Sequence, residues 1–148
     1  MKTLIVILII AALVQSAILP VNIVLIILLC RSYIRADRAN LFLAFAFGLF
    51  LSHLNLSIWG LESIVYLSLI EITGWLSKSR LASNSFLIIP IIFVLLSVHD
   101  LVFSFFIHQS FEFSSKIFIE SLVSLPIFYL IRFWEERFIV HKSIKLKV

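Results

Sequence analysis

Residues 41–76, LFLAFAFGLFLSHLNLSIWGLESIVYLSLIEITGWL, decide how this chain is organised. Two apolar runs meet there at a short turn, residues 55–60, which contains no Lys or Arg. Because the cytoplasmic loops of membrane proteins are enriched in Lys and Arg, this turn predicts a helical hairpin whose tip faces away from the cytoplasm. The position of the turn then fixes the direction of every other segment.

The composition is typical of a membrane protein. Hydrophobic residues make up 62% of the 148 residues, charged residues make up 14%, and the mean hydropathy is +1.17. So few charges argue against a soluble domain. The net charge of +4 does not indicate nucleic-acid binding, because the basic residues border the apolar runs. In such positions they orient a chain in the membrane and contact anionic lipid.

The apolar runs predict an all-α, polytopic membrane protein with a single integral membrane domain. Six spans are expected at about residues 3–19, 21–34, 40–54, 61–76, 85–107 and 114–133, and residues 134–148 are expected to form a basic cytoplasmic tail. The first run resembles a secretory signal, but it continues to Leu19, so we expect an uncleaved helix. The second covers only about 21 Å of a hydrocarbon core of about 30 Å. Either snorkelling of Arg31 and Arg35 extends it, or the break at Pro20 sets the depth at which it enters. Pro126 is expected to kink the sixth span.

The basic residues predict that both termini face the cytoplasm. With six spans, the segments that face outward hold only Lys116 of the 12 Lys and Arg residues. The inward segments hold the others, which are Lys2, Arg31, Arg35, Arg38, Lys78, Arg80, Arg132, Arg137, Lys142, Lys145 and Lys147. This asymmetry favours six spans over five, with an N-in, C-in topology.

A small-residue ridge is expected on the third span, where Ala44, Gly48 and Ser52 recur every four residues. In lipid, such a ridge lets another helix backbone approach closely. The partner is either a helix of the same fold, which we favour, or a helix of another protein. Gly60, at the start of the fourth span, is assigned to the same helix-packing or partner interface.

Ionisable residues inside the apolar runs form a predicted intramembrane polar cluster of Glu62, Glu71, His99, Asp100 and Glu120. An acidic residue at the centre of a membrane helix costs about 2.5–3.5 kcal/mol, so each one requires a reason. The cluster is expected towards the outer half of the bundle, together with His53 and Asn55, and Lys116 is spaced to pair with Glu120. A proton or cation path and a hydrated cavity for a small solute are two interpretations. We favour a third, hydrogen bonding between helices or a contact with a partner.

Catalysis is not expected. His99 and Asp100 are adjacent, so on a helix they point about 100° apart, which argues against a base held by an orienting carboxylate. The four His residues show no i,i+4 pair, so neither a metal nor another cofactor is expected. Cys30, in an apolar run, is expected to be a small buried side chain.

A lipid anchor at the inner surface is predicted at the end of the chain. Trp134 lies among aromatic residues at an interfacial position, and Lys142, Lys145 and Lys147 follow it. Arg132 and Glu136 are spaced i,i+4 and are expected to pair. Aromatic rings favour the interface, and lysines favour anionic lipid.

Several short motifs between residues 20 and 78 resemble the rod shape-determining protein MreD family of bacteria. They are Pro20-Val21-Asn22, the basic loop 31–38, the stretch Gly48 to Ser52, the turn that starts at Asn55, and Trp59-Gly60-Leu61. Residues 124–130, SLPIFYL, are similar to the closing helix of that family. Two positions depart from it: Ser52 stands where the family usually carries Asp, and Glu62 where Asn or His is common.

The resemblance implies a non-catalytic scaffold of the cytoplasmic (inner) membrane, in the machinery that controls cell shape and peptidoglycan elongation. It implies an MreC-like single-span membrane partner and, through that partner, an MreB filament and a peptidoglycan synthase. The implied fold is similar to the S-component fold of energy-coupling-factor transporters. The alternative is therefore a vitamin-like small-solute binding subunit of a transporter.

Overall fold

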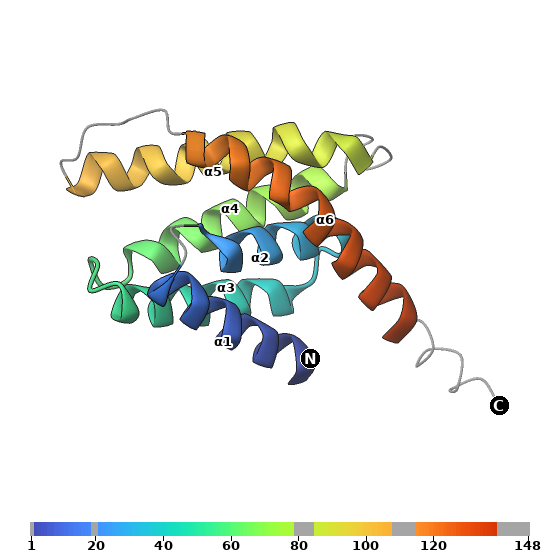
Figure 1. Cartoon of the computed structure of the whole chain (residues 1–148), viewed down its shortest axis with the longest axis horizontal. Coiled ribbons are helices and arrows are strands. Elements are labelled where there is room, and N and C mark those ends of the chain that lie inside the picture. The colour runs from blue at the N-terminus through green and yellow to red at the C-terminus, as the bar shows by residue number, and fades with distance from the viewer. Residues whose placement is uncertain (1, 19–20, 79–84, 108–114, 139–148) are drawn as a thin grey trace.

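The computed structural model describes residues 2–18, 21–78, 85–107 and 115–138, and it is entirely helical over those residues (Figure 1). The elements are α1 (Lys2–Ala17), α2 (Ile23–Ile34), α3 (Arg38–Leu54), α4 (Leu61–Ser77), the short 3₁₀ helix η2 (Ser85–Leu87), α5 (Ile88–Ile107) and α6 (Ser115–Phe138). The all-α prediction is confirmed, and each predicted span contains one α-helix. α6 continues past residue 133 to Phe138, into the segment predicted as tail.

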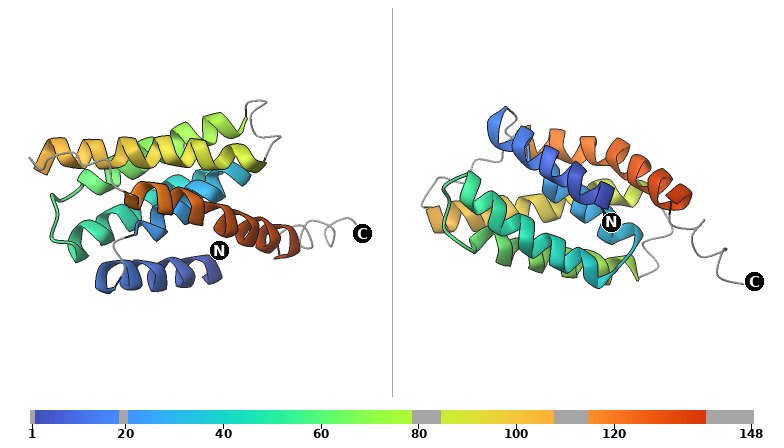
Figure 2. Two further views of the ribbon diagram at one scale, coloured as in Figure 1. Left: turned by 45° about the horizontal axis from the view of Figure 1, so that its top comes forward. Right: turned by 90° about the horizontal axis from the view of Figure 1, so that it is seen from below.

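Consecutive helices run in opposite directions, so the bundle has two ends (Figures 1 and 2). We call them the Asn55 end, which holds the turn between α3 and α4, and the Asp37 end, which holds the link between α2 and α3. α3 and α4 form a hairpin, and α6 packs on both α2 and α5. α6 runs through Pro126 and changes direction along its length in Figure 1, as the kink prediction expected.

α2 is the central helix of the bundle. It has 12 residues, and all those from Val24 to Tyr33 are buried. At 1.5 Å per residue it is about 18 Å long, shorter than a hydrocarbon core of about 30 Å. It contacts α1, α3, α4, α5 and α6, so apolar side chains on every face of it are buried.

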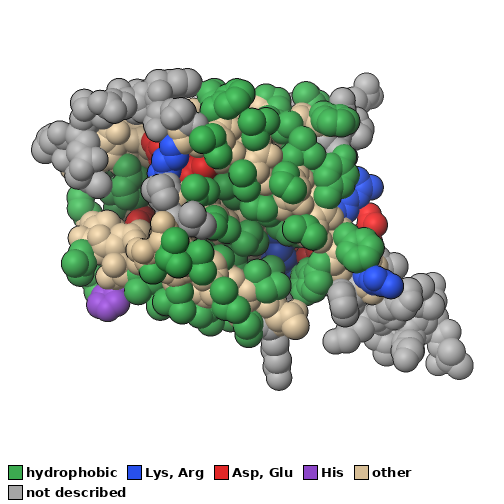
Figure 3. Space-filling view, viewed as in Figure 1, with side chains coloured by type: hydrophobic (Ala, Val, Ile, Leu, Met, Phe, Trp, Pro, Cys, Tyr) green, Lys and Arg blue, Asp and Glu red, His purple; other side chains and the backbone are tan. Residues whose placement is uncertain are grey.

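The outer surface is largely apolar, and several ionisable groups are buried. Large hydrophobic side chains on all five longer helices are exposed, among them Val6, Phe42, Ile64, Phe105 and Leu130. Figure 3 shows hydrophobic side chains over most of the visible face. Monomeric soluble proteins rarely expose contiguous apolar patches of this extent. Among the described residues, α5 and α6 contain stretches long and apolar enough to cross a membrane, Ile88–Phe106 and Lys116–Arg137, whereas α1, α2 and α3 are shorter.

The small-residue ridge of α3 packs inside the fold. Ala44, Gly48 and Ser52 are all buried. A Cβ atom on Gly48 would lie 2.5 Å from the Cα atom of Ser63 and 2.7 Å from its backbone nitrogen. α3 and α4 are therefore in backbone contact at Gly48, and α4 occupies the groove that a partner helix would need there.

Gly60 does not pack against another helix of the fold, which is one of the two roles predicted for it. It precedes α4 with φ of 85°, in the left-handed region that glycine adopts readily, and a Cβ on it would meet nothing within 4 Å. Leu56, in the same turn, also has a positive φ of 50°. Gly60 therefore lets the chain reverse direction and is not a packing residue.

We predict that Gly48→Ala destabilises the folded protein by about 1–3 kcal/mol, because the new methyl group meets the Ser63 backbone, which cannot move without α4. The measurement is the denaturation midpoint of the detergent-purified protein. Gly74→Ala is the matched control. Its Cβ would make ordinary contacts of 3.5 Å with Ala36 and Ser32, so we expect no loss, and a gain of up to about 1 kcal/mol from helix propensity. Equal midpoints for the two variants would contradict the close approach.

Candidate functional site

A polar network lies towards the Asn55 end of the bundle and joins most of the predicted cluster. Its ionisable members are Glu62 of α4, His99 and Asp100 of α5, and Glu120 of α6. Glu62 is 6% exposed and Glu120 is fully buried at 0%. His99 lies close enough to both carboxylates to interact electrostatically with them. The helices therefore bring together four of the five residues that the sequence assigned to one cluster.

Glu62 holds the turn between α3 and α4. Its Oε1 atom accepts hydrogen bonds from Asn55 Nδ2 at 3.3 Å and from Ser57 Oγ at 3.4 Å. Asn55 thus belongs to the network, as predicted. His53 does not, because it is exposed and its ring lies edge-on to Trp59 at 5.9 Å.

Glu120 holds the corner between α1 and α2. Its Oε1 atom accepts a hydrogen bond from the backbone N–H of Asn22 at 2.8 Å, and it lies 3.8 Å from Lys116 Nζ, the predicted i,i+4 partner. Gln15 completes the corner. Its amide donates to Asn22 Oδ1 at 3.2 Å and accepts from the Val24 backbone N–H at 3.1 Å. Neither Gln15 nor Asn22 was predicted from the sequence to join the cluster, although an amide at the end of an apolar run is a signal for such a role.

His99 and Asp100 contact each other, contrary to the prediction. His99 Nδ1 lies 2.9 Å from Asp100 Oδ1. The prediction used only the directions of the Cα–Cβ bonds, and rotation about the side-chain torsions brings an imidazole and a carboxylate together across that angle. The His99 ring also stacks on Phe103, with centroids 4.6 Å apart, and lies 6.0 Å from the ring of Tyr66. The prediction that Asp100 cannot orient His99 is therefore wrong, and the absence of catalysis stays a prediction.

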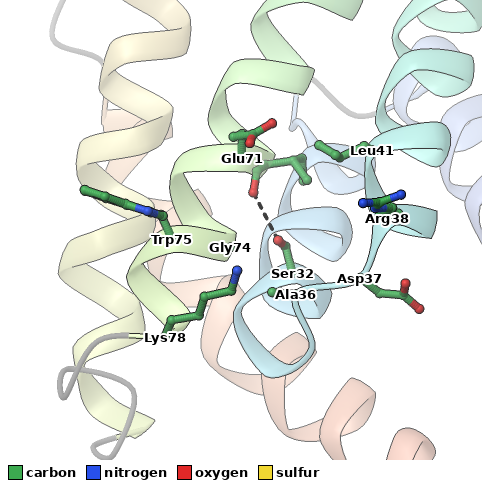
Figure 4. A pocket seen from close by; sticks show the side chains of 10 residues that line it. Ser32, Ala36, Asp37, Arg38, Leu41, Glu71, Gly74, Trp75 and Lys78 are labelled. Atoms are coloured by element: carbon green, nitrogen blue, oxygen red, sulfur yellow. Dashed lines mark hydrogen bonds between the residues drawn. The ribbon is translucent and has the colours of Figure 1, made fainter.

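Glu71 does not belong to this network. It is exposed on α4 and lines a cleft near the Asp37 end, with Ser32 and Lys78 (Figure 4). The sequence placed it in the cluster because hydropathy reports depth along a helix and not the face on which a residue lies. The face is set by packing: Tyr66, Leu69 and Ile70 are the buried residues of this part of α4.

Three buried oxygen atoms have no hydrogen-bond partner among the described residues. They are Glu62 Oε2, Glu120 Oε2 and Ser52 Oγ. Buried polar atoms are normally paired, and a partly satisfied network is less stable than a complete one. The network at the Asn55 end therefore retains free acceptor capacity.

A second buried network, which the sequence analysis missed, lies towards the Asp37 end. Arg31 of α2 is 2% exposed, and its Nε lies 3.1 Å from Glu135 Oε1 of α6. Its Nη1 donates to Asn40 Oδ1 of α3, and Asn40 Nδ2 donates to the Arg35 carbonyl oxygen at 2.7 Å. Arg31 thus joins three helices inside the protein. The prediction that it snorkels to the membrane surface is wrong.

The predicted lipid anchor is described only in part. Trp134 is half-buried against the core, and Arg132 Nε pairs with Glu136 Oε1 at 2.9 Å, as the i,i+4 spacing predicted. Lys142, Lys145 and Lys147 lie outside the described residues. Cys30 is buried, as expected, and its thiol lies 3.6 Å from the Ser124 carbonyl oxygen.

Comparisons with protein-family models, curated proteins and solved structures find no match to this chain. The chemistry of the two buried networks and the distribution of apolar surface are therefore the structural observations on which a functional proposal can rest.

We predict that Glu135→Ala destabilises the protein by about 3–5 kcal/mol, because it leaves the Arg31 charge buried without its carboxylate. Chemical denaturation of the purified protein measures this. The neighbouring Glu136→Ala, which removes the exposed pair with Arg132, is the control and should cost at most about 1 kcal/mol. Replacing both partners, as Arg31→Met with Glu135→Leu, should restore most of the loss. A loss of similar size in the two single variants would rule out a special role for the buried pair.

Proposed function

We propose that this protein is a non-catalytic, multi-pass scaffold of the cytoplasmic membrane that acts in bacterial cell-shape control and peptidoglycan elongation. The observation that supports it most is the inversion of polarity. Buried ionisable groups are hydrogen-bonded inside the bundle, while large apolar side chains cover the helices outside. Lipid favours both features, because polar groups in a membrane helix face the interior of a bundle. The resemblance of residues 20–78 to the MreD family supplies the cellular role.

In this proposal all six helices are membrane-embedded, and the Asn55 end faces outward. The basic residues favour that orientation, because Arg35, Arg38 and Lys78 lie near the Asp37 end. α2 need not cross the whole hydrocarbon core, because its neighbours surround it. Three further helices, α1, α3 and α4, are also shorter than the hydrocarbon core, and local thinning of the bilayer accommodates such helices at modest cost.

The partner in this proposal is the transmembrane helix of an MreC-like protein, and it docks on an exposed apolar face. The ridge at Gly48 is not that face, because α4 fills it. A variant such as Gly48→Leu would therefore lose the partner by unfolding the hairpin and would not test the contact. Exposed positions on the outer helices are the informative ones.

We predict that a photo-crosslinking residue captures an MreC-like partner from one side of the bundle only. Suitable exposed positions are Ile7 on α1, Phe42 on α3, Ile64 on α4 and Leu130 on α6. The protein should first be found in the membrane fraction after alkaline extraction. Positions on the opposite side are the controls within the same membranes. If the protein is membrane-integrated and no position captures the partner, the scaffold proposal fails.

The alternative, a small-solute binding subunit, is favoured by one observation: at the Asn55 end, one carboxylate oxygen of Glu62 and one of Glu120 have no hydrogen-bond partner within the part of the chain that the structure describes. A solute with donor groups would satisfy them. In that case, the purified protein would retain a vitamin-sized ligand, detectable by mass spectrometry, and Glu62→Ala or Asp100→Ala would abolish the retention. The scaffold proposal expects no such ligand. The exposed Glu136→Ala variant is the control, since its carboxylate lies on the surface of α6.

A further inference from the structure

A cleft of about 260 Å³ opens near the Asp37 end, where the end of α2, the start of α3 and the end of α4 meet (Figure 4). Its small floor residues are Ser32, Ala36 and Gly74. The other lining residues are Asp37, Arg38, Leu41, Ile70, Glu71, Trp75 and Lys78. The two networks of the candidate site include none of these residues, so the function proposed above leaves the cleft unexplained.

The floor of the cleft is open because its residues are small. A Cβ on Gly74 would lie 3.5 Å from both Ala36 Cβ and Ser32 Oγ. A side chain larger than that of alanine at this position would therefore project into the cleft. Ser32 Oγ donates its hydrogen bond to the Ile70 carbonyl at 3.1 Å, which leaves the hydroxyl oxygen as an acceptor. In Figure 4 the Lys78 side chain reaches into the cleft towards Ser32, while Asp37 and Trp75 point outward at its rim.

The charges around the cleft are balanced and separated. Arg38 and Lys78 are cationic, and Asp37 and Glu71 are anionic. Glu71 and Lys78 are seven residues apart on α4, so they share a face and lie about 10 Å apart along the axis. Within the described part of the chain, Arg38, Glu71 and Lys78 form no ion pair. Asp37 does have a basic neighbour, since its Oδ2 atom lies 3.8 Å from Arg35 Nε. A ligand that complements this lining carries both a negative and a positive group.

We propose that this cleft binds the headgroup of an aminophospholipid, a phosphodiester joined to a primary ammonium. The proposal rests on the membrane location proposed above. Lys78 and Arg38 receive the phosphate, as basic pockets between helices do on the cytoplasmic side of membrane proteins. Glu71 receives the ammonium, whose N–H groups form charge-assisted hydrogen bonds to a carboxylate.

The position of Glu71 favours a lipid as the source of that headgroup. Glu71 lies about 9 Å from the end of α4 on an exposed face, where an ionised carboxylate in contact with lipid is costly unless a cation accompanies it. Trp75, one turn further along, is 81% exposed and has the amphipathic ring that settles at the headgroup level. A bound aminophospholipid therefore supplies the cation that Glu71 lacks and places its acyl chains along the apolar surface.

The chemistry also predicts selectivity among lipids. Phosphatidylcholine carries a quaternary ammonium, which has no N–H group to donate to Glu71. Phosphatidylglycerol carries no cation at all, so Glu71 repels its phosphate. Phosphatidylethanolamine has both required groups and should bind most tightly.

The test is native mass spectrometry of the detergent-purified protein, titrated with phosphatidylethanolamine, phosphatidylcholine and phosphatidylglycerol of identical acyl chains. We expect the wild-type protein to bind phosphatidylethanolamine about tenfold more tightly than phosphatidylcholine. Glu71→Gln should abolish that preference, because phosphatidylethanolamine loses a charge-assisted hydrogen bond whereas phosphatidylcholine loses only the attraction between charges. Lys78→Gln should weaken binding of both lipids about fivefold, through the phosphate. Glu136→Gln, an exposed carboxylate on α6 at the same end, is the matched control and should behave as wild type.

Equal affinity for the ethanolamine and choline lipids, or a preference for phosphatidylglycerol, would overturn the proposal. So would a loss of the preference in Glu136→Gln, because binding would then not depend on the cleft. Glycerophosphoethanolamine, the free headgroup, is included as a competitor, and binding of it as tight as that of the lipid would overturn the lipid assignment. The assay requires no partner, so its failure leaves the scaffold proposal standing, whereas absence of the protein from the membrane fraction counts against the membrane location itself.

Discussion

The buried guanidinium of Arg31 is the constraint on which the Asp37 end of the bundle depends. A charge that is 2% exposed on the central helix must be matched, and here the match comes from Glu135 of α6 and Asn40 of α3. α2 can therefore take only one rotation about its axis and one depth relative to those helices. Rotating α2 in either direction would move Arg31 away from the Glu135 carboxylate. Apolar packing alone is less selective, because a helix that is hydrophobic on every face can slide or rotate at little cost.

The Asn55 end differs from the Asp37 end in its balance of acidic and basic groups. Among the residues described there, carboxylates outnumber the cations, and Glu62 and Glu120 are held by amide and hydroxyl donors from the turns beside them. Each of these two carboxylates uses one oxygen to fix a corner of the chain, and its other oxygen is buried without a partner among the described residues. One end of the bundle is thus locked by a completed ion pair, and the other retains unused acceptors. Any ligand, proton or partner that acts on the buried groups has more to gain at the Asn55 end.

The sequence predicted the helices well because hydropathy and helix length are local properties. It placed Glu62, His99, Asp100 and Glu120 together, since their depths could be counted from the ends of the spans. It did not find the Arg31–Glu135 pair, because 104 residues separate the partners and neither has a spacing that marks it. It misplaced Glu71 for a related reason, since depth along a helix does not specify a face. The His99–Asp100 contact was missed because a rule about backbone directions was applied to side chains that rotate.

The hairpin of residues 41–76 shows how a backbone contact and a turn together determine where side chains lie. Contact between Gly48 and the Ser63 backbone brings α3 and α4 together, and Gly60 and Leu56 adopt the positive φ values that the reversal needs. That register puts Ser52 and Glu62 at the same end of the hairpin, one on each arm. Ser52 contributes a buried hydroxyl oxygen, and Glu62 contributes a buried carboxylate oxygen; neither has a hydrogen-bond partner among the described residues. The close contact at Gly48 and the reversal at Gly60 therefore place two unsatisfied polar groups beside one turn, although ten residues of sequence separate them.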